Sequence, residues 1–303
     1  MQHFLSIAPT VDPLVTDSLR FSRFLSSSSA DPMISSLDYL GRLERPRDLS
    51  SFRLVELPSF IIEANTQSQF QRPYAIACDP WNNLVVADRS LNRVVVVTPG
   101  GELRLRINAT DPVSVAVGDG GNIWVATDSN DEIKCFSPTG KLLRIIRSPQ
   151  VSRITIAPTN GDLILATQDC VACVTPNGEL RWRSDAGDGI LYGLVCTPDG
   201  ELLTGSWSKQ IRCLLSLDDG QQVGKIGYHF PSPSEIATTS RFFVVANPVR
   251  HNVAVHSHKG EEIHNWGSFG SRPGEFNCPG SIAILHDDRV AVADVNNARI
   301  QIF

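Results

Sequence analysis

The stretch VVVVTPGGELRLR, residues 94–106, decides the fold, because it joins an apolar strand to a second strand through a short polar turn closed by glycine. The same arrangement recurs four times, as IKCFSPTGKLLRI from Ile133, VACVTPNGELRWR from Val171, CLLSLDDGQQVGK from Cys213 and VAVHSHKGEEIHN from Val253. The closing glycines are Gly101, Gly140, Gly178, Gly220 and Gly260, with successive spacings of 39, 38, 42 and 40 residues. A period near forty in strand-like sequence predicts four-stranded blades arranged in a propeller.

Two further apolar strands precede each hairpin, and their copies predict the number of blades. Short apolar strands begin in the stretches 72–80, 111–119, 151–159, 191–199, 233–240 and 279–287, and a tight turn and a second strand follow each one. These strands are rich in Val, Ile and Leu, as a sheet covered on both faces requires. Six copies predict an all-β, six-bladed propeller over residues 51–303, with no helix between residues 54 and 303.

The last repeat, VAVADVNNARIQIF at 290–303, contains two strands of a hairpin and no outer strand after them. An unpaired outer position would leave a sheet edge open. The segment 51–73, SFRLVELPSFIIEANTQSQFQRP, is similar to 261–279, EEIHNWGSFGSRPGEFNCP, in which an outer strand precedes Phe and Pro. We therefore predict that an N-terminal strand near residues 52–57 pairs with the C-terminal strand 299–303 and closes the ring.

Two repeats carry a more specific signature. VADRSLNRVVVV at 86–97 and VADVNNARIQIF at 292–303 both run Val-Ala-Asp, polar residues, Arg five positions after the Asp, and an apolar strand. FGSRPGEFNCPGSIAI at 269–284 adds Phe-Gly, Gly-Glu-Phe and Pro. These residues resemble the NHL repeat, and the order of elements is similar to the six-bladed propellers at the C-terminal end of TRIM-NHL proteins. The resemblance spans about residues 52–303 and weakens in the middle repeats; the fifth has Asn247 and Asn252 in place of Asp and Arg.

The resemblance implies a recognition module that serves as a substrate or adaptor part in ubiquitination or in post-transcriptional regulation. No RING or B-box pattern of Cys and His precedes the repeats, so ligase activity of the TRIM type would have to come from another chain. The signature residues themselves have a structural interpretation. Asp88 with Arg93, and Asp294 with Arg299, bracket the loop between two strands, so charge-assisted hydrogen bonds are expected to fix that loop, with Asn297 assisting.

Composition restricts the class of protein further. The formal net charge is −5, which offers no global positive field for a nucleic acid. No apolar run reaches membrane-spanning length and no secretory leader is recognisable, and the seven cysteines are odd in number and scattered. We therefore expect a cytoplasmic, monomeric propeller without a membrane partner. Residues 1–50, rich in Ser, are expected to be largely disordered.

Candidate chemical sites are weak. His256 and His258 share a strand face by spacing, but they lie beside a glycine turn and are expected to be solvated surface residues. Cys170 and Cys173 form a single CxxC without a second pair. Asp79, Asp119 and Asp199 follow first strands, where turn hydrogen bonds are expected. We predict no catalytic residue, metal or cofactor, and a metal-dependent lyase or hydrolase is the least favoured hypothesis.

A propeller presents loops on two faces, and loops commonly carry recognition. The face that gathers the loops entering first strands and leaving second strands is predicted to bind through cations and aromatic residues: Arg72, Tyr74, Arg93, Arg153, Tyr192, Trp207, Lys209, Arg250 and Arg299. Such a mixture suits single-stranded RNA. The same face also collects acidic residues, among them Asp111, Asp128 and Glu235, so a protein partner is favoured and single-stranded RNA is the alternative.

Overall fold

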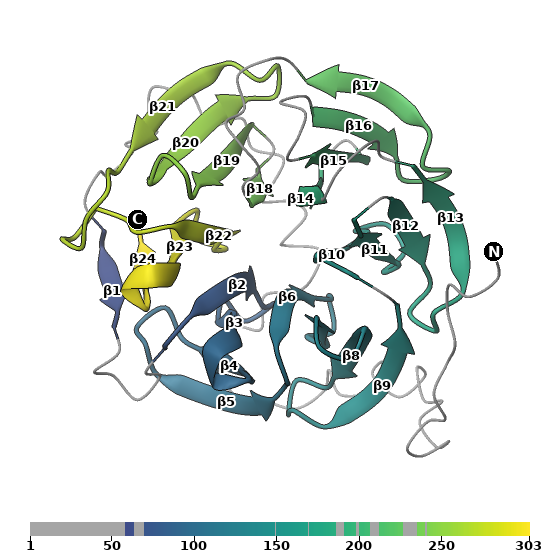
Figure 1. Cartoon of the computed structure of the whole chain (residues 1–303), viewed down its shortest axis with the longest axis horizontal. Helices are drawn as coiled ribbons and strands as arrows, with labels where there is room; N and C mark the ends of the chain where they lie inside the picture. Colours follow the sequence, from purple (N-terminus) through teal and green to yellow (C-terminus); the bar gives the residue numbers. More distant parts are fainter. Residues whose placement is uncertain are drawn as a thin grey trace, which may run out of the picture. The chain divides into compact units, whose positions relative to one another are not determined.

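The computed structural model describes residues 58–63, 70–148, 150–168, 170–185, 191–197, 200–206, 212–226, 235–239 and 241–303. These residues form six four-stranded antiparallel sheets that follow one another around a ring, as predicted (Figure 1). Two single-turn 3-10 helices, η3 (Arg89–Leu91) and η4 (Val295–Asn297), lie in the loops after β3 and β23. Residues 1–50, expected to be disordered, lie outside the described residues.

The strands run from the centre of each sheet to its rim in chain order. The first three sheets are β2 (Pro73–Cys78), β3 (Leu84–Asp88), β4 (Arg93–Val97) and β5 (Leu103–Asn108); β6 (Pro112–Val117), β7 (Ile123–Thr127), β8 (Glu132–Phe136) and β9 (Leu142–Arg147); and β10 (Arg153–Ile156), β11 (Leu163–Ala166), β12 (Val171–Val174) and β13 (Leu180–Ser184). The fourth and fifth are β14 (Leu191–Cys196), β15 (Glu201–Ser206), β16 (Arg212–Ser216) and β17 (Gln222–Ile226); and β18 (Ile236–Thr238), β19 (Phe242–Asn247), β20 (Asn252–Ser257) and β21 (Glu262–Trp266). The sixth contains β22 (Pro279–Ile284), β23 (Val290–Asp294) and β24 (Arg299–Ile302), with β1 (Phe60–Ile62) as its outer strand.

The sixth sheet closes the ring with a strand from the other end of the chain. β1 pairs antiparallel with β24, with Phe60 opposite Ile302 and Ile62 opposite Ile300. Ser59 adds a backbone N–H bond of 2.6 Å and an Oγ–H bond of 3.0 Å, both to the carbonyl oxygen of Ile302. The closing strand is therefore 60–62, whereas the predicted segment 52–57 lies outside the described residues.

The spacing to a buried phenylalanine explains this shift. Phe70 stands three residues before Pro73, which begins β2, and Phe276 stands three residues before Pro279, which begins β22. Both phenylalanines are buried, and they anchor the loop that follows the outer strand. An outer strand therefore ends about eight to ten residues before the phenylalanine, which corresponds to Ile62 and not to residue 57.

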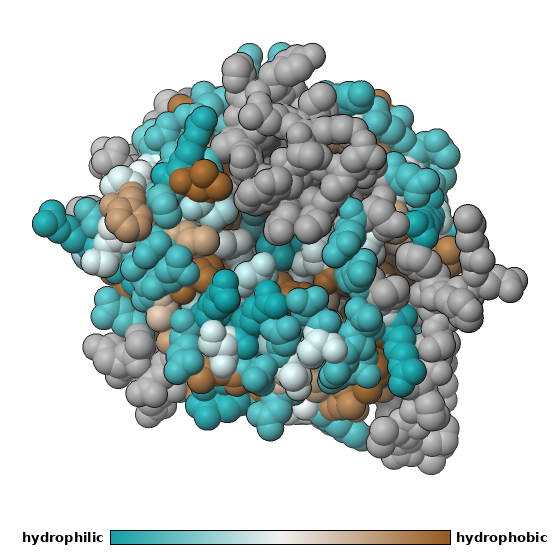
Figure 2. Space-filling model, in the orientation of Figure 1, coloured by the Kyte–Doolittle hydropathy of each residue, from teal (hydrophilic) through white to brown (hydrophobic). Residues whose placement is uncertain are grey.

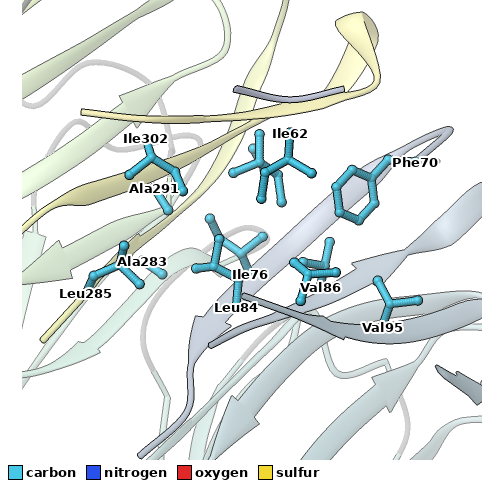
Figure 3. Close-up of a cluster of buried hydrophobic side chains, with 13 residues drawn as sticks. Ile62, Phe70, Ile76, Leu84, Val86, Val95, Ala283, Leu285, Ala291 and Ile302 are labelled. Carbon is cyan, nitrogen blue, oxygen red and sulfur yellow. The ribbon is translucent and has the colours of Figure 1, made fainter. Parts of the chain in front are cut away.

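Apolar side chains fill the space between neighbouring sheets. Ile62 and Ile302 from the sixth sheet pack with Phe70, Ile76 and Leu84 from the first, and all five are buried (Figure 3). Clusters of the same kind lie between the first and second sheets and between the second and third. Because each sheet is covered on both faces by its neighbours, the hydrophobic core is distributed around the ring.

The recurrent glycine of the sequence repeat lies where one sheet meets the next. At Gly220, φ is +70°, and a Cβ atom there would lie 2.4 Å from the Trp182 ring of the preceding outer strand. A Cβ at Gly140 would similarly lie 3.0 Å from the side chain of Leu105. A left-handed turn without a side chain is therefore needed for the outer strand of one blade to pack on the turn of the next.

The residues described include no helix long and apolar enough to cross a membrane.

Replacing the closing strand's buried contact tests the ring directly. Ile62→Asp places a carboxylate where no part of the side chain is exposed, so we expect the free energy of unfolding to fall by more than about 4 kcal/mol. Urea unfolding followed by tryptophan fluorescence measures the change. Ile263→Asp is the matched control, since Ile263 lies on the outer strand β21 with a largely exposed side chain. Equal, small effects of both substitutions would contradict closure by β1.

Candidate binding face

The loop face consists of the loops that enter the first strand of each blade and those that join second to third strands. In the view of Figure 2 the surface over β2–β5 and β6–β9 is mostly hydrophilic, whereas hydrophobic atoms stand out over the region of β20 and β21. The side chains predicted to bind at this face fall into three groups, which are buried, exposed, or outside the described residues.

Arg299 belongs to the buried group. Its Nε donates to Asp294 at 2.8 Å, its Nη1 donates to the Ser271 carbonyl at 2.7 Å, and its Nη2 donates to the carbonyls of Arg272 and Glu275 at 2.9 Å. Asp294 is fully buried and Arg299 nearly so. The guanidinium group of Arg299 therefore lies inside the fold, where it holds the loop before β22, instead of on the predicted binding surface.

The Asp294 carboxylate extends this network. It accepts hydrogen bonds from the Asn277 backbone at 2.7 Å and from Asn297 Nδ2 at 2.8 Å, and Asn297 Nδ2 also donates to the Gly270 carbonyl at 2.8 Å. Asp294 and Asn297 thus attach the loop after β23 to the loop before β22. One buried ion pair fixes two loops of the face, which is more than the single loop expected from the sequence.

The first blade has a looser version of the same pair. Arg93 Nη2 lies 3.4 Å from Asp88 Oδ2, and both side chains are buried. Asp88 also accepts from the Arg72 backbone at 2.9 Å and from the Gln71 backbone at 3.2 Å. Arg93 is therefore committed to the interior in the same way as Arg299. In the fifth blade Asn247 accepts from the backbones of Val249 and Arg250 at 3.1 and 3.0 Å, so an amide replaces the carboxylate there.

Arg153 forms a second internal network, around Tyr74. The guanidinium groups of Arg72, Arg89 and Arg153 lie 5.8, 5.3 and 5.5 Å from the centre of the Tyr74 ring, which is a cation–π arrangement. Arg153, on the third blade, is buried and forms an ion pair with Glu235, which precedes the first strand of the fifth blade. Burial by itself lowers the pKa of Arg153, but Glu235 and Tyr74 outweigh it and raise that pKa, so Arg153 stays charged.

The positive charges of this network are balanced. Arg89 Nε lies 2.5 Å from Asp111 Oδ1, and its Nη2 lies 3.0 Å from Asp128 Oδ2. The first cause of the raised pKa of Arg89 is its hydrogen bond to Asp111. Arg89 and Arg153 are therefore neutralised by acidic neighbours, which leaves Arg72 as the exposed cation beside Tyr74.

The remaining predicted residues differ in what can be said of them. Arg250 is exposed in the loop between β19 and β20, and Tyr74 is half-buried. Tyr192 lies in β14, but its side chain is outside the described residues, as are Trp207 and Lys209 altogether. The described part of the predicted set that can contact a ligand is thus Arg72, Tyr74 and Arg250.

The structure adds an exposed aromatic residue that sequence reasoning missed. Phe269 is 67% exposed in the loop before β22, and the His251 ring packs edge-on against it with centroids 4.9 Å apart. His251 Nδ1 in turn accepts a hydrogen bond from the Cys278 backbone at 3.1 Å. Val249, 59% exposed, lies two residues before His251. The only signal in the sequence was an aromatic residue in the middle of a polar loop, at Ser268-Phe269-Gly270.

The histidines and carboxylates considered for chemistry serve the fold. His256 was expected on the surface, but it is fully buried, with Nδ1 3.4 Å from the Gly260 carbonyl, because the third strand is covered by its neighbours up to the glycine turn. Asp79 accepts from the Trp81 and Asn83 backbones at 2.9 and 2.8 Å, a turn arrangement. Asp199 lies outside the described residues. Within the described ranges no group of three or more His, Cys, Asp or Glu could hold a metal ion.

The thiols are held in their protonated form. Burial raises the pKa of Cys78, Cys135 and Cys196 to about 12 and that of Cys173 to about 11. All seven cysteines are free. A protonated thiol is a poor nucleophile, so these four cysteines are unsuited to catalysis near neutral pH.

Comparison with known proteins supports the fold more than the function. The family model of the NHL repeat matches residues 276–303, which include η4, Asp294 and Arg299. A chain of the hydrazine synthase of Kuenenia stuttgartiensis is structurally similar, with a TM-score of 0.60, 11% sequence identity, and coverage of 79% of this chain and 97% of that one. No curated protein sequence matches the chain. At this identity, the likeness to the synthase extends to the propeller fold alone.

The buried ion pair of the sixth blade has a measurable contribution. Asp294→Ala leaves the buried Arg299 without its counter-ion, and we expect a loss of about 3–5 kcal/mol in the free energy of unfolding. Asp287→Ala is the control, because the Asp287–Arg289 pair is partly exposed and is expected to contribute less than about 1 kcal/mol. Urea unfolding measures both. A loss below about 1 kcal/mol for Asp294→Ala would show that the pair does not hold the loops.

The raised thiol pKa values predict slow alkylation of the native protein. At pH 8, Cys78, Cys135, Cys173 and Cys196 are expected to remain unmodified by iodoacetamide, because the pH lies well below the pKa values of their thiols. All four should react after denaturation in guanidinium chloride. Peptide mass spectrometry gives the modified fraction at each site, and rapid native labelling at any of the four would contradict the prediction.

Proposed function

We propose that the propeller is a non-catalytic recognition module that binds a protein partner through its loop face, with Phe269 as the central contact. The observation that supports this most directly is the exposure of a large aromatic side chain on a loop fastened by buried groups. Hot spots of protein interfaces are commonly aromatic residues and arginines on preorganised surfaces. In keeping with the resemblance to TRIM-NHL propellers, the module would select a partner for a larger assembly in the cytoplasm, where free cysteines are usual.

The loop that carries Phe269 is held from both sides. The Gly270 N–H donates to the Phe276 carbonyl at 3.1 Å, and the Phe276 N–H donates to the Ser268 carbonyl at 2.8 Å. Arg299 binds three carbonyls of the same loop from below. Phe269 therefore loses little conformational entropy when a partner covers it, which favours tight binding.

The charge around Phe269 indicates the chemistry of the partner. Arg250 and Arg272, in the two loops that border this position, are both exposed. Among the described residues neither side chain forms an ion pair, so both can meet carboxylates of a partner. The proposed partner surface therefore combines an apolar or aromatic anchor with acidic residues.

Single-stranded RNA at this face is less well supported than a protein. Three of the predicted phosphate contacts, Arg93, Arg153 and Arg299, are buried and engaged with carboxylates. Tyr74 is surrounded by guanidinium groups and is half-buried, so its ring is not available as an open stacking platform. The exposed loop-face residues that remain suit a protein interface better.

Selection from a random twelve-residue peptide library displayed on phage tests the proposal. The purified protein should enrich peptides with an aromatic or aliphatic residue next to Asp or Glu, and Phe269→Ala should weaken their binding at least tenfold, because a central aromatic contact is worth about 2 kcal/mol or more. Ile263→Ala is the control, since Ile263 is similarly exposed on the outer strand β21. Binding that is insensitive to Phe269→Ala, with an unchanged melting temperature, would reject this site.

A further inference from the structure

The outer strands of the first three blades carry arginines on their exposed side. In β5, Arg104 and Arg106 are exposed while Leu103, Leu105 and Ile107 turn towards the interior. In β13, Arg181 and Arg183 are exposed on either side of the buried Trp182. β9 ends with the exposed Arg147. Residues two apart in a strand are about 6.6–6.8 Å apart on one face, so each strand presents its cations in a row.

The distribution of charge around the rim is uneven. The glycine turns and outer strands of the first three blades, residues 98–108, 137–148 and 175–185, contain seven basic side chains and three acidic ones. The basic residues are Arg104, Arg106, Lys141, Arg144, Arg147, Arg181 and Arg183, and the acidic ones are Glu102, Glu179 and Asp185. The corresponding segments of the other three blades, 216–226, 257–266 and 58–63, contain two basic and five acidic residues. The seven basic residues are termed the arginine rim.

The arginine rim is continuous from one blade to the next. Leu105 of β5 packs on Gly140 in the turn of the second blade, and Ile146 of β9 packs on Gly178 in the turn of the third. Arg144 of β9 donates to the carbonyl of Pro176 and to the side chain of Asn177 in that same turn. Figure 1 shows β5, β9 and β13 following one another around the perimeter. The three strands thus form one arc of positive charge on a chain whose net charge is negative.

The ion pairs within the rim strands are mostly exposed. Arg104 and Glu102 lie 3.1 Å apart and Arg183 and Asp185 lie 3.7 Å apart, and all four side chains are at least one-third exposed. Such exposed pairs contribute little to stability. These two arginines can therefore exchange their carboxylate partner for an external anion.

Arg181 is the arginine with a buried counter-ion. Its Nε lies 3.2 Å from the carboxylate of Asp162, which is almost fully buried, so Arg181 contributes less free charge to the rim. Within the ranges that the structure describes, Arg106 and Arg147 make no ion pair. The free positive charge of the rim thus comes chiefly from β5 and β9.

We propose that the arginine rim binds the phosphodiester backbone of a nucleic acid without reading its bases. Arginine suits phosphate because its planar fork of donors can bind two oxygens at once. Stacking of bases would require exposed aromatic rings, and the one aromatic residue on these three strands, Trp182, is buried. Sequence-independent contact with phosphates is what an arc of arginines without aromatics can provide.

Edge protection and a protein partner each account for less of the charge pattern. Charged residues protect sheet edges from aggregation, but either sign would serve, and the outer strands of the remaining blades do not repeat the pattern. A protein partner would need an apolar centre, and the exposed apolar side chains on these strands are Leu143 and Leu180, on different blades. The rim lies on the outer strands and not on the loop face, so this inference does not depend on the partner proposed above.

Binding of a fluorescent 30-nucleotide RNA of random sequence, followed by anisotropy at several salt concentrations, tests the proposal. The unaltered protein should lose about 10³-fold in affinity between 50 and 200 mM salt if most of the seven cations contact phosphate. A variant with Arg104→Gln, Arg106→Gln, Arg147→Gln and Arg183→Gln should bind at least tenfold more weakly at 100 mM salt. Its log–log salt slope should be smaller by about 3.

The matched control removes the same charge elsewhere, by Lys225→Gln, Lys259→Gln, Arg241→Gln and Arg289→Gln, and should bind like the unaltered protein. Equal losses in both variants would show a general charge effect and overturn the rim. Absence of binding by the unaltered protein at 50 mM salt would also overturn it. Salt-dependent self-association by the unaltered protein in sedimentation velocity, abolished by the rim substitutions, in place of RNA binding would instead assign the rim to the acidic arc of a second copy. Unchanged melting temperatures verify folding of the variants.

Discussion

The pairing of β1 with β24 is the constraint on which the rest of the structure depends. It gives the sixth sheet its outer strand and places Ile62 against both Ile302 and the apolar side chains of the first sheet. Without it, the first and sixth blades would face each other across an incomplete interface, and the distributed core would have an open end. The ring is therefore a single cooperative unit in which the contact most distant in sequence completes all the others.

The packing of each outer strand on the next glycine turn accounts for both the repeat and the surface. One side of an outer strand supplies apolar residues such as Leu105, Ile146 and Trp182 to the neighbouring turn. The opposite side is then free to carry charge, because it contributes nothing to the core. The arginines of β5, β9 and β13 occupy that free side, so a charged surface is compatible with a well-packed ring.

Buried ion pairs divide the charged residues of the loop face into structural and available ones. Asp294 with Arg299 and Glu235 with Arg153 hold loops from different blades together, at positions where desolvation makes an unpaired charge costly. Residues that remain exposed, such as Phe269, Arg250 and Arg272, lie on the loops that these pairs fix. Rigidity at the face thus comes from the very arginines that the sequence suggested as ligand contacts.

The sequence by itself determined the number of blades, the order of strands and the need for ring closure, because strand alternation and glycine spacing are local patterns that chain stereochemistry dictates. It also identified Asp88, Asp294 and Asn297 as loop-fixing residues by their fixed spacing to the following strand. It could not determine that closure uses 60–62, that His256 is buried, or that Arg93, Arg153 and Arg299 point inward while Phe269 points out. Those outcomes depend on which carboxylates and sheets come within a few ångströms of each side chain, and only the folded ring brings residues from different blades that close.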